Sequence, residues 1–139
     1  MADDAPRPPL ELDLVWEGDL RFTGTVGGHR IALDGDGKAA VSPVQALGLA
    51  LASCMGTDVA LILTRGRHPL RALRAHLVAH RAPSDPRRVV AVELRFEVEG
   101  AVPPEAVERA IALSHDKYCS VWHSLRTDIA FETSFDVMP

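Results

Sequence analysis

Two cysteines are the residues of this 139-residue chain best suited to do chemistry. Cys54 lies in an apolar stretch with helical spacing, and Cys119 lies at the end of a second such stretch. The chain contains no other cysteine, so neither residue belongs to a Cys-x-x-Cys motif. A thiolate is a nucleophile, and a second thiol can trap its oxidised form as a disulfide. The pattern indicates a reactive thiol and a resolving thiol, and the alternative is two inert buried thiols.

Cys54 needs surroundings that lower its pKa from about 8.5 if it is to react as a thiolate. Ser42 is the expected N-cap of its helix, and Cys54 lies about three turns beyond it, too far for the helix dipole to act. Asp58 follows one turn later and would raise the pKa of Cys54 if it were ionised and unpaired. We therefore expect Asp58 to form a salt bridge or a helix–helix hydrogen bond. A cation from elsewhere is expected to activate Cys54: Arg30, Arg21 or, less obviously, a histidine.

A metal site is the rival interpretation of the second cysteine. His115, Cys119 and His123 follow one another at four-residue intervals, and Cys54 could complete four ligands for zinc or another transition metal. Against this, residues 116–120 suggest that the helix bends or breaks within the stripe. We therefore expect neither a metal nor a cofactor.

Hydrophobic periodicity predicts the elements that must position these residues. Residues 43–65 form the Cys54 helix, which follows Ser42 and stops at Gly66, and its apolar surface suggests that a second subunit covers it. Another helix begins at Pro103 and reaches Tyr118, with one or two further turns over 120–126. Strands are predicted over residues 10–16, 20–26, 29–33, 70–81, 90–98 and 129–137. This order of elements is typical of an α+β fold rich in antiparallel pairs.

Composition limits the classes of protein to which the chain can belong. We expect a flexible tail over residues 1–9 and a single domain over residues 10–139. The net charge of −4 argues against nucleic acid as a partner. We expect no segment long and apolar enough to span a membrane and no signal peptide, which predicts a cytoplasmic protein without a membrane partner.

The two cysteine segments together resemble the OsmC/Ohr family, the osmotically inducible protein C and organic hydroperoxide resistance proteins. The matching residues are Ser42-Pro43-x-Gln45 leading to Ala52-Ser53-Cys54, then Gly56-x-Asp58-Val59, and Ser114-x-x-Lys117-Tyr118-Cys119-Ser120-Val121. The resemblance extends from about Leu10 to Val137 and is to a less characterised OsmC-like branch. It implies an OsmC-like β(3)-α-β(2)-α(1–2)-β fold with antiparallel-rich sheets around central helices, in an intertwined homodimer.

The resemblance also implies thiol-dependent reduction of organic hydroperoxides in oxidative or osmotic stress defence. Cys54 would form a sulfenic acid, Cys119 would resolve it, Arg30 or Arg21 would meet the thiolate, and a lipoyl or thioredoxin-type dithiol would recycle the pair. The chain departs from the family at Val44, where those enzymes carry a Glu. The alternative is therefore a non-catalytic protein of the same fold that binds a small apolar ligand or senses redox state.

Overall fold

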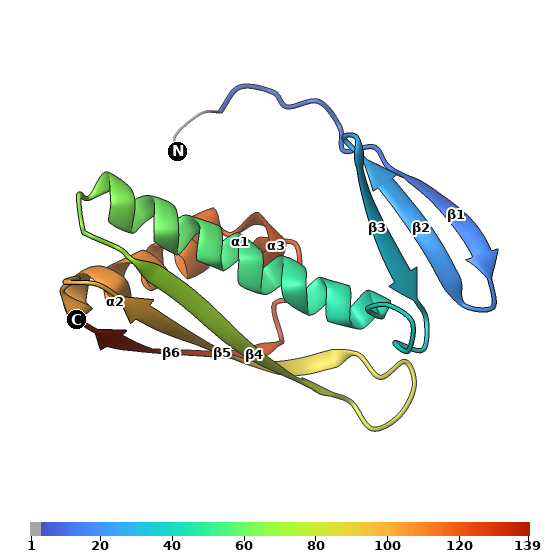
Figure 1. Ribbon diagram of the computed structural model, residues 1–139. Coiled ribbons are helices and arrows are strands. Elements are labelled where there is room, and N and C mark those ends of the chain that lie inside the picture. The colour runs from blue at the N-terminus through green and yellow to red at the C-terminus, as the bar shows by residue number, and fades with distance from the viewer. Residues whose placement is uncertain (1–3) are drawn as a thin grey trace. The chain divides into compact units, whose positions relative to one another are not determined.

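The computed structural model describes residues 4–139 and has the predicted order of elements (Figure 1). Within the predicted tail, residues 1–3 lie outside the described part, and residues 4–9 are exposed and carry neither helix nor strand. The chain divides into two compact units, one ending at Ala46 and the other covering Leu47–Pro139. Each unit is described by itself.

The first unit is an antiparallel meander of three strands in the order β1-β2-β3. Its strands are β1 (Asp13–Gly18), β2 (Arg21–Val26) and β3 (His29–Asp34). The predicted turns at Gly18-Asp19 and Gly27-Gly28 are confirmed, and all four residues have positive φ angles. The prediction that the first strand starts at residue 10 is wrong. Pairing begins at Asp13, opposite Thr25, and β2 ends at Val26, so in this register no residue of β2 lies opposite Leu10.

Helix α1 (Pro43–Arg65) has the predicted bounds. At its start, the Ser42 N–H donates to Gln45 Oε1 at 2.9 Å, and the Gln45 N–H donates to Ser42 Oγ at 3.2 Å. This reciprocal pair is a capping box, which satisfies two N–H groups that the first helical turn leaves without a carbonyl. The first turn of α1 carries no acidic residue.

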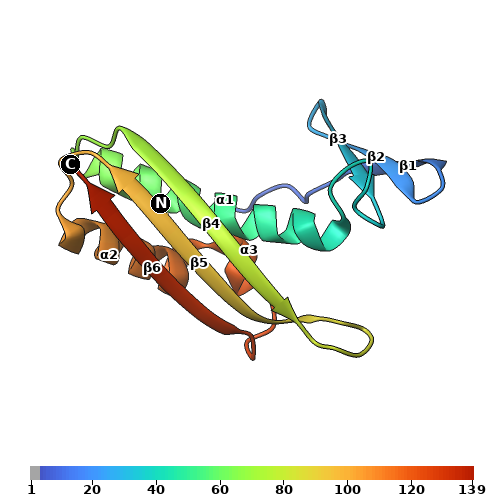
Figure 2. The ribbon, with the colours of Figure 1, turned by 60° about the horizontal axis from the view of Figure 1, so that its bottom comes forward.

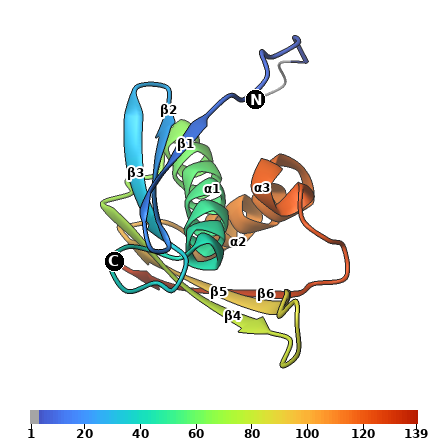
Figure 3. The same ribbon diagram turned by 90° about the vertical axis from the view of Figure 1, so that its right-hand side faces the viewer.

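The second unit packs its helices on one face of a three-stranded sheet (Figures 2 and 3). The sheet has the order β4-β5-β6, with β4 and β5 antiparallel and β5 and β6 parallel. A helical crossover joins the parallel pair. The elements are β4 (Ala72–Arg81), β5 (Val89–Glu99), α2 (Pro104–Leu113), the π-helical η1 (Ser114–Tyr118), α3 (Ser120–His123) and β6 (Ala130–Met138).

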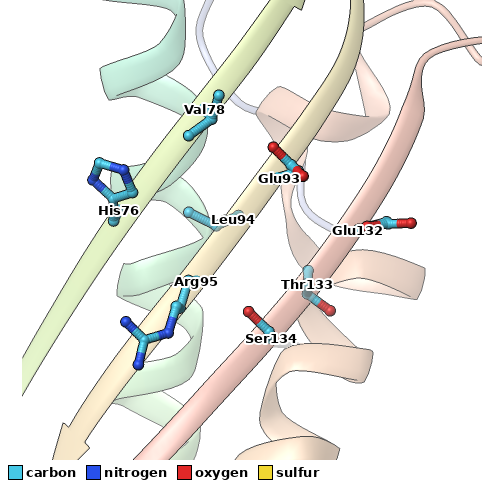
Figure 4. A pocket seen from close by; sticks show the side chains of 8 residues that line it. All are labelled: His76, Val78, Glu93, Leu94, Arg95, Glu132, Thr133 and Ser134. Atoms are coloured by element: carbon cyan, nitrogen blue, oxygen red, sulfur yellow. The ribbon is translucent and has the colours of Figure 1, made fainter.

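Alternation along β5 separates the core from the outer face of this sheet. The inward residues Val92, Leu94, Phe96 and Val98 are buried and join a core with residues of α1, α2 and Cys119. The outer face is charged, and Figure 4 shows a hollow on it between residues of all three strands. His80 lies 3.0 Å from Glu93, and Arg95 pairs with Glu97 and Asp136. These exposed ion pairs indicate a solvated surface.

Helix α1 is long and apolar enough to cross a membrane by length and composition, with a mean hydropathy of 1.9 over 18 residues. On this measure, the prediction that no segment reaches that length is wrong. The finding is weak evidence for a span, because the core helix of a soluble protein meets the same test. One side of α1 lies in the core through Met55, Val59 and Leu63. Only 28% of the apolar window is buried, so much of its surface is uncovered by the described chain.

The backbone at Gly100, just after β5, predicts a large effect of a small substitution. Gly100 has a φ of +136°, and an added Cβ would lie 2.2 Å from the carbonyl oxygen of Pro69. We expect Gly100→Ala to lower the free energy of unfolding by more than about 2 kcal/mol in urea denaturation. Gly56→Ala is the control, because its Cβ meets nothing within 4 Å inside α1 and should raise stability by up to about 1 kcal/mol. A loss below about 0.5 kcal/mol for Gly100→Ala would contradict this account.

Candidate functional site

Cys119 lies at a break in the helical crossover, between η1 and α3. Helix α2 continues into the π-helical turn η1, which ends with the Cys119 N–H donating to the Ser114 carbonyl oxygen at 2.8 Å. At Cys119 the backbone turns to φ −70° and ψ 99°, outside the helical region, and α3 starts at the next residue. The predicted helix to Tyr118, the break and the further helical turn are confirmed. The π-helical form of the last turn was not predicted.

Cys119 is fully buried and caps the short helix that follows it. Its Sγ accepts a hydrogen bond from the Trp122 N–H at 3.4 Å, and its carbonyl accepts one from the His123 N–H at 3.0 Å. A thiol with an N–H directed at it, inside an apolar core, is held in one orientation.

Cys54 meets this same segment from α1. Its half-buried Sγ lies 3.8 Å from Ser120 Oγ, and it also has hydrogen-bond contact with the Val121 N–H and the Cys119 thiol. The predicted thiol pair is therefore brought into contact. Both sulfurs are free in this structure.

The two thiols differ in acidity because both their burial and their hydrogen bonds differ. Burial opposes ionisation of Cys54, but donors at Val121, Cys119 and Ser120 hold its pKa below the ordinary value of a thiol. Burial raises the pKa of Cys119 to about 11, despite the Trp122 N–H, and the neighbouring Cys54 adds to the rise. The site therefore holds two thiols of unequal acidity, and Cys54 is the more acidic. Backbone, hydroxyl and thiol donors lower the pKa of Cys54, and activation by a cation stays a prediction.

Asp58 makes the helix–helix hydrogen bond that we expected of it. Its carboxylate is buried, and Oδ2 accepts a hydrogen bond from Ser114 Oγ at 2.8 Å. The bond joins α1 to the start of η1. The Asp58 charge raises the pKa of both Cys54 and Cys119.

His115 and His123, the histidines of the alternative metal site, make contacts with other side chains and with the backbone. The ring of His115 stacks on Trp122 at 5.5 Å between centroids, and its Nδ1 lies 2.8 Å from Asp116 Oδ1. His123 Nε2 lies 2.9 Å from the carbonyl oxygen of His115. Within residues 4–139, no group of three or more His, Cys, Asp or Glu side chains could hold a metal ion. The rival metal interpretation is wrong, because the break at Cys119 ends the continuous helix that it required.

Arg30 and Arg21 both lie in the first unit. Arg30 is exposed on β3, opposite Thr25 of β2. Arg21, at the start of β2, lies opposite Asp34 of β3 in the strand register. A role for either arginine at Cys54 stays a prediction.

Sequence reasoning assigned no role at the site to Ser114, Ser120 or Val121. All three stand in the second cysteine segment, and Ser114 is fully buried. The role of Val121 could have been found from one signal: a break before Ser120 frees backbone N–H groups near Cys119. The hydroxyl contacts of Ser114 and Ser120 reach α1 and have no such local signal.

The bond between Ser114 and Asp58 predicts a loss of stability. Ser114→Ala leaves a buried carboxylate without this donor, so we expect it to lower the free energy of unfolding by about 1–3 kcal/mol. Ser53→Ala is the matched control, because Ser53 is exposed and donates to a carbonyl of its own helix, that of Ala50. Its effect should stay within about 0.5 kcal/mol. Equal losses of unfolding free energy for the two variants in urea denaturation would contradict a stabilising role of the buried hydrogen bond.

Comparisons with known proteins place the chain in a family. The family model described as OsmC-like protein matches residues 35–134. Protein YhfA of Escherichia coli (strain K12) is 34% identical over 132 residues, which cover 93% of this chain and 98% of that protein.

Two solved structures share the fold. A hypothetical protein from Aquifex aeolicus VF5 has a TM-score of 0.89 at 24% identity, covering 95% of this chain and 98% of its own. An organic hydroperoxide resistance protein OsmC from Legionella pneumophila has a TM-score of 0.71 at 14% identity, covering 96% of this chain and all of its own. The α+β architecture and the resemblance of the two cysteine segments are confirmed: the chain belongs to the OsmC-like protein family.

Proposed function

We propose that the protein reduces organic hydroperoxides with its two thiols, as part of a defence against oxidative or osmotic stress. The contact between Cys54, whose pKa lies below the ordinary value of a thiol, and Cys119, whose pKa is raised, carries this proposal, because a peroxidatic thiol must ionise more readily than the thiol that resolves it. Membership of the OsmC-like family supports it, since a relative of the same fold is described as an organic hydroperoxide resistance protein.

The first step takes place at Cys54. Its thiolate attacks the hydrogen-bearing oxygen of ROOH, the O–O bond breaks, and the released alkoxide takes up a proton to leave as ROH. Cys54 becomes a sulfenic acid, oxidised by two electrons. The donors at Ser120 and Val121 hold the sulfur in place for this attack.

The second step joins the thiols. Cys119 sulfur attacks the sulfenic sulfur, an S–S bond forms, and the hydroxyl leaves as water with the proton that Cys119 gives up. A lipoyl or thioredoxin-type dithiol then reduces the disulfide and is itself oxidised. A cytoplasmic location fits this cycle, because that compartment keeps such dithiols reduced.

A binding or redox-sensing protein on the same fold is the second candidate. The first turn of α1, with Val44, offers no carboxylate, and the side chain of Gln45 is occupied by the capping box. A protein without that acid could hold a small apolar ligand and lack peroxide turnover.

Exposed apolar residues support a homodimer. In the first unit, Leu14 and Ile31 share one sheet face through Gly24, and Trp16 lies on the same face. All three are about half exposed or more, and Leu49 of α1 is 59% exposed. A second copy of the chain would cover such surface on both partners.

Thiol counting on cysteine variants tests the enzyme. With one equivalent of cumene hydroperoxide, the wild type should lose both thiols within seconds, and Cys119→Ser should lose its single thiol without multiple turnovers. Cys54→Ser should keep its thiol, because burial of Cys119, the largest cause of its raised pKa, remains in this variant. Hydrogen peroxide in parallel tests the preference for organic substrates. Two wild-type thiols that persist for minutes would favour the ligand-binding candidate.

Light scattering tests the dimer. The wild type should have twice the chain mass of 15.0 kDa at micromolar concentration. Leu49→Asp places a charge on the exposed apolar side of α1 and should shift the protein toward the monomer. Ala112→Asp makes the same change at an exposed position of α2 and should leave the mass unchanged. A monomeric wild type would refute the dimer.

A further inference from the structure

The first step of the proposed reaction needs a proton for its leaving group. When the Cys54 thiolate attacks a hydroperoxide, the oxygen that departs with the organic group is an alkoxide, a strong base. The thiolate has no proton to give to it. A positioned side chain that delivers a proton to a reacting group accelerates a reaction by about 10²–10⁴-fold. The polar groups at the Cys54 sulfur therefore decide how this step can be assisted.

The Ser120 hydroxyl lies at the reacting sulfur. Its Oγ is 3.8 Å from Cys54 Sγ, and either atom of this pair could be the donor. Ser120 is exposed, whereas Cys54 is half-buried, so the hydroxyl is in contact with the sulfur and open to water. A hydroperoxide that meets the sulfur on this side comes within hydrogen-bond reach of the hydroxyl.

The backbone around Ser120 is held by hydrogen bonds. Ser120 is the first residue of α3, and its carbonyl oxygen accepts a hydrogen bond from Ser124 Oγ at 2.6 Å. The His123 N–H donates to the carbonyl oxygen of Cys119 at 3.0 Å and closes the same turn. Because a single torsion separates the serine backbone from its hydroxyl oxygen, this turn keeps the Ser120 hydroxyl at Cys54.

The titratable side chains near the two thiols are engaged elsewhere in the described chain. The Asp58 carboxylate is buried and accepts a hydrogen bond from Ser114. His115 is stacked on Trp122, and His123 is bonded to a backbone carbonyl. The first turn of the described helix α1 carries no acidic residue. These contacts leave the Ser120 hydroxyl as the side chain best placed to assist the leaving oxygen.

We propose that Ser120 is a catalytic residue of the first step, in which its hydroxyl gives a proton to the leaving alkoxide. The Cys54 sulfur bonds to the hydrogen-bearing oxygen as the O–O bond breaks, so Cys54 is oxidised by two electrons and the hydroperoxide is reduced. The Ser120 proton moves to the departing oxygen, and the organic product leaves as ROH. Ser120 takes a proton back from water, which leaves hydroxide. The inference rests on the proposed function.

Two reagents separate proton delivery from the reactivity of the sulfur. Cumene hydroperoxide releases an alkoxide, which needs a proton, whereas iodoacetamide alkylates the same thiolate and releases iodide, which needs none. Thiol loss on the reduced protein is followed by stopped flow. We expect Ser120→Ala to slow the reaction with the hydroperoxide by about tenfold or more and to slow alkylation much less. Ser120→Thr keeps a hydroxyl and should restore most of the rate.

Ser53→Ala is the matched control. It removes an exposed hydroxyl next to Cys54 in the sequence, one that is bonded to its own helix, and should leave both rates unchanged. Far-UV circular dichroism checks that each variant is folded, and Ser120→Gly carries the same expectation if Ser120→Ala unfolds.

Equal slowing of both reactions by Ser120→Ala would overturn the inference, because the hydroxyl would then act on the sulfur alone. A wild type that iodoacetamide alkylates but that consumes no hydroperoxide would refute the proposed function, and the role of Ser120 with it. A wild type that consumes hydroperoxide as fast as Ser120→Ala does would refute the role of Ser120 alone.

Discussion

The candidate site depends on one backbone constraint, the departure from helical geometry at Cys119. In an unbroken helix, the N–H groups of Val121 and Trp122 would bind carbonyls four residues earlier. Because the chain leaves the helical region at Cys119, these N–H groups are free at the start of α3 and reach Cys54 and Cys119 instead. The π-helical turn before the break supplies the extra residue per turn that brings Cys119 back onto Ser114.

That geometry makes two chemically identical groups unequal. Both sulfurs are at least partly buried, and the charge of Asp58 raises the pKa of both. Cys54 receives several donors and becomes the more acidic thiol, whereas Cys119 lies in the core and acts as a donor toward it. The difference comes from the deeper burial of Cys119 and from the number and direction of the hydrogen bonds at each sulfur.

Local patterns predicted the elements, and they could not predict the contacts between them. The alternation around Phe96 fixed the buried face of β5, and Ser42 with Pro43 marked the start of α1. A buried carboxylate at Asp58 needs a hydrogen-bond donor. Hydrophobic periodicity could not predict that the donor is Ser114, because Ser114 lies on another helix. The contact between Cys54 and Cys119 was predicted from the family resemblance and not from the spacing of residues. The spacing of His115, Cys119 and His123 places them on one side only of a continuous helix, and the helix breaks at Cys119. The predicted row of metal ligands therefore does not form.

Val44 stands where the family motif carries a carboxylate, and it takes no part in the hydrogen bonds that lower the pKa of Cys54. A carboxylate in the first turn of α1 would add negative charge near the start of that helix, whereas lowering a thiol pKa requires donors or positive charge. The donors that act on Cys54 all come from residues 119–121, within the second unit. Residue 44 is not among them. In the proposed reaction, a carboxylate at that position would orient a bound hydroperoxide, so its replacement by Val44 bears on substrate recognition.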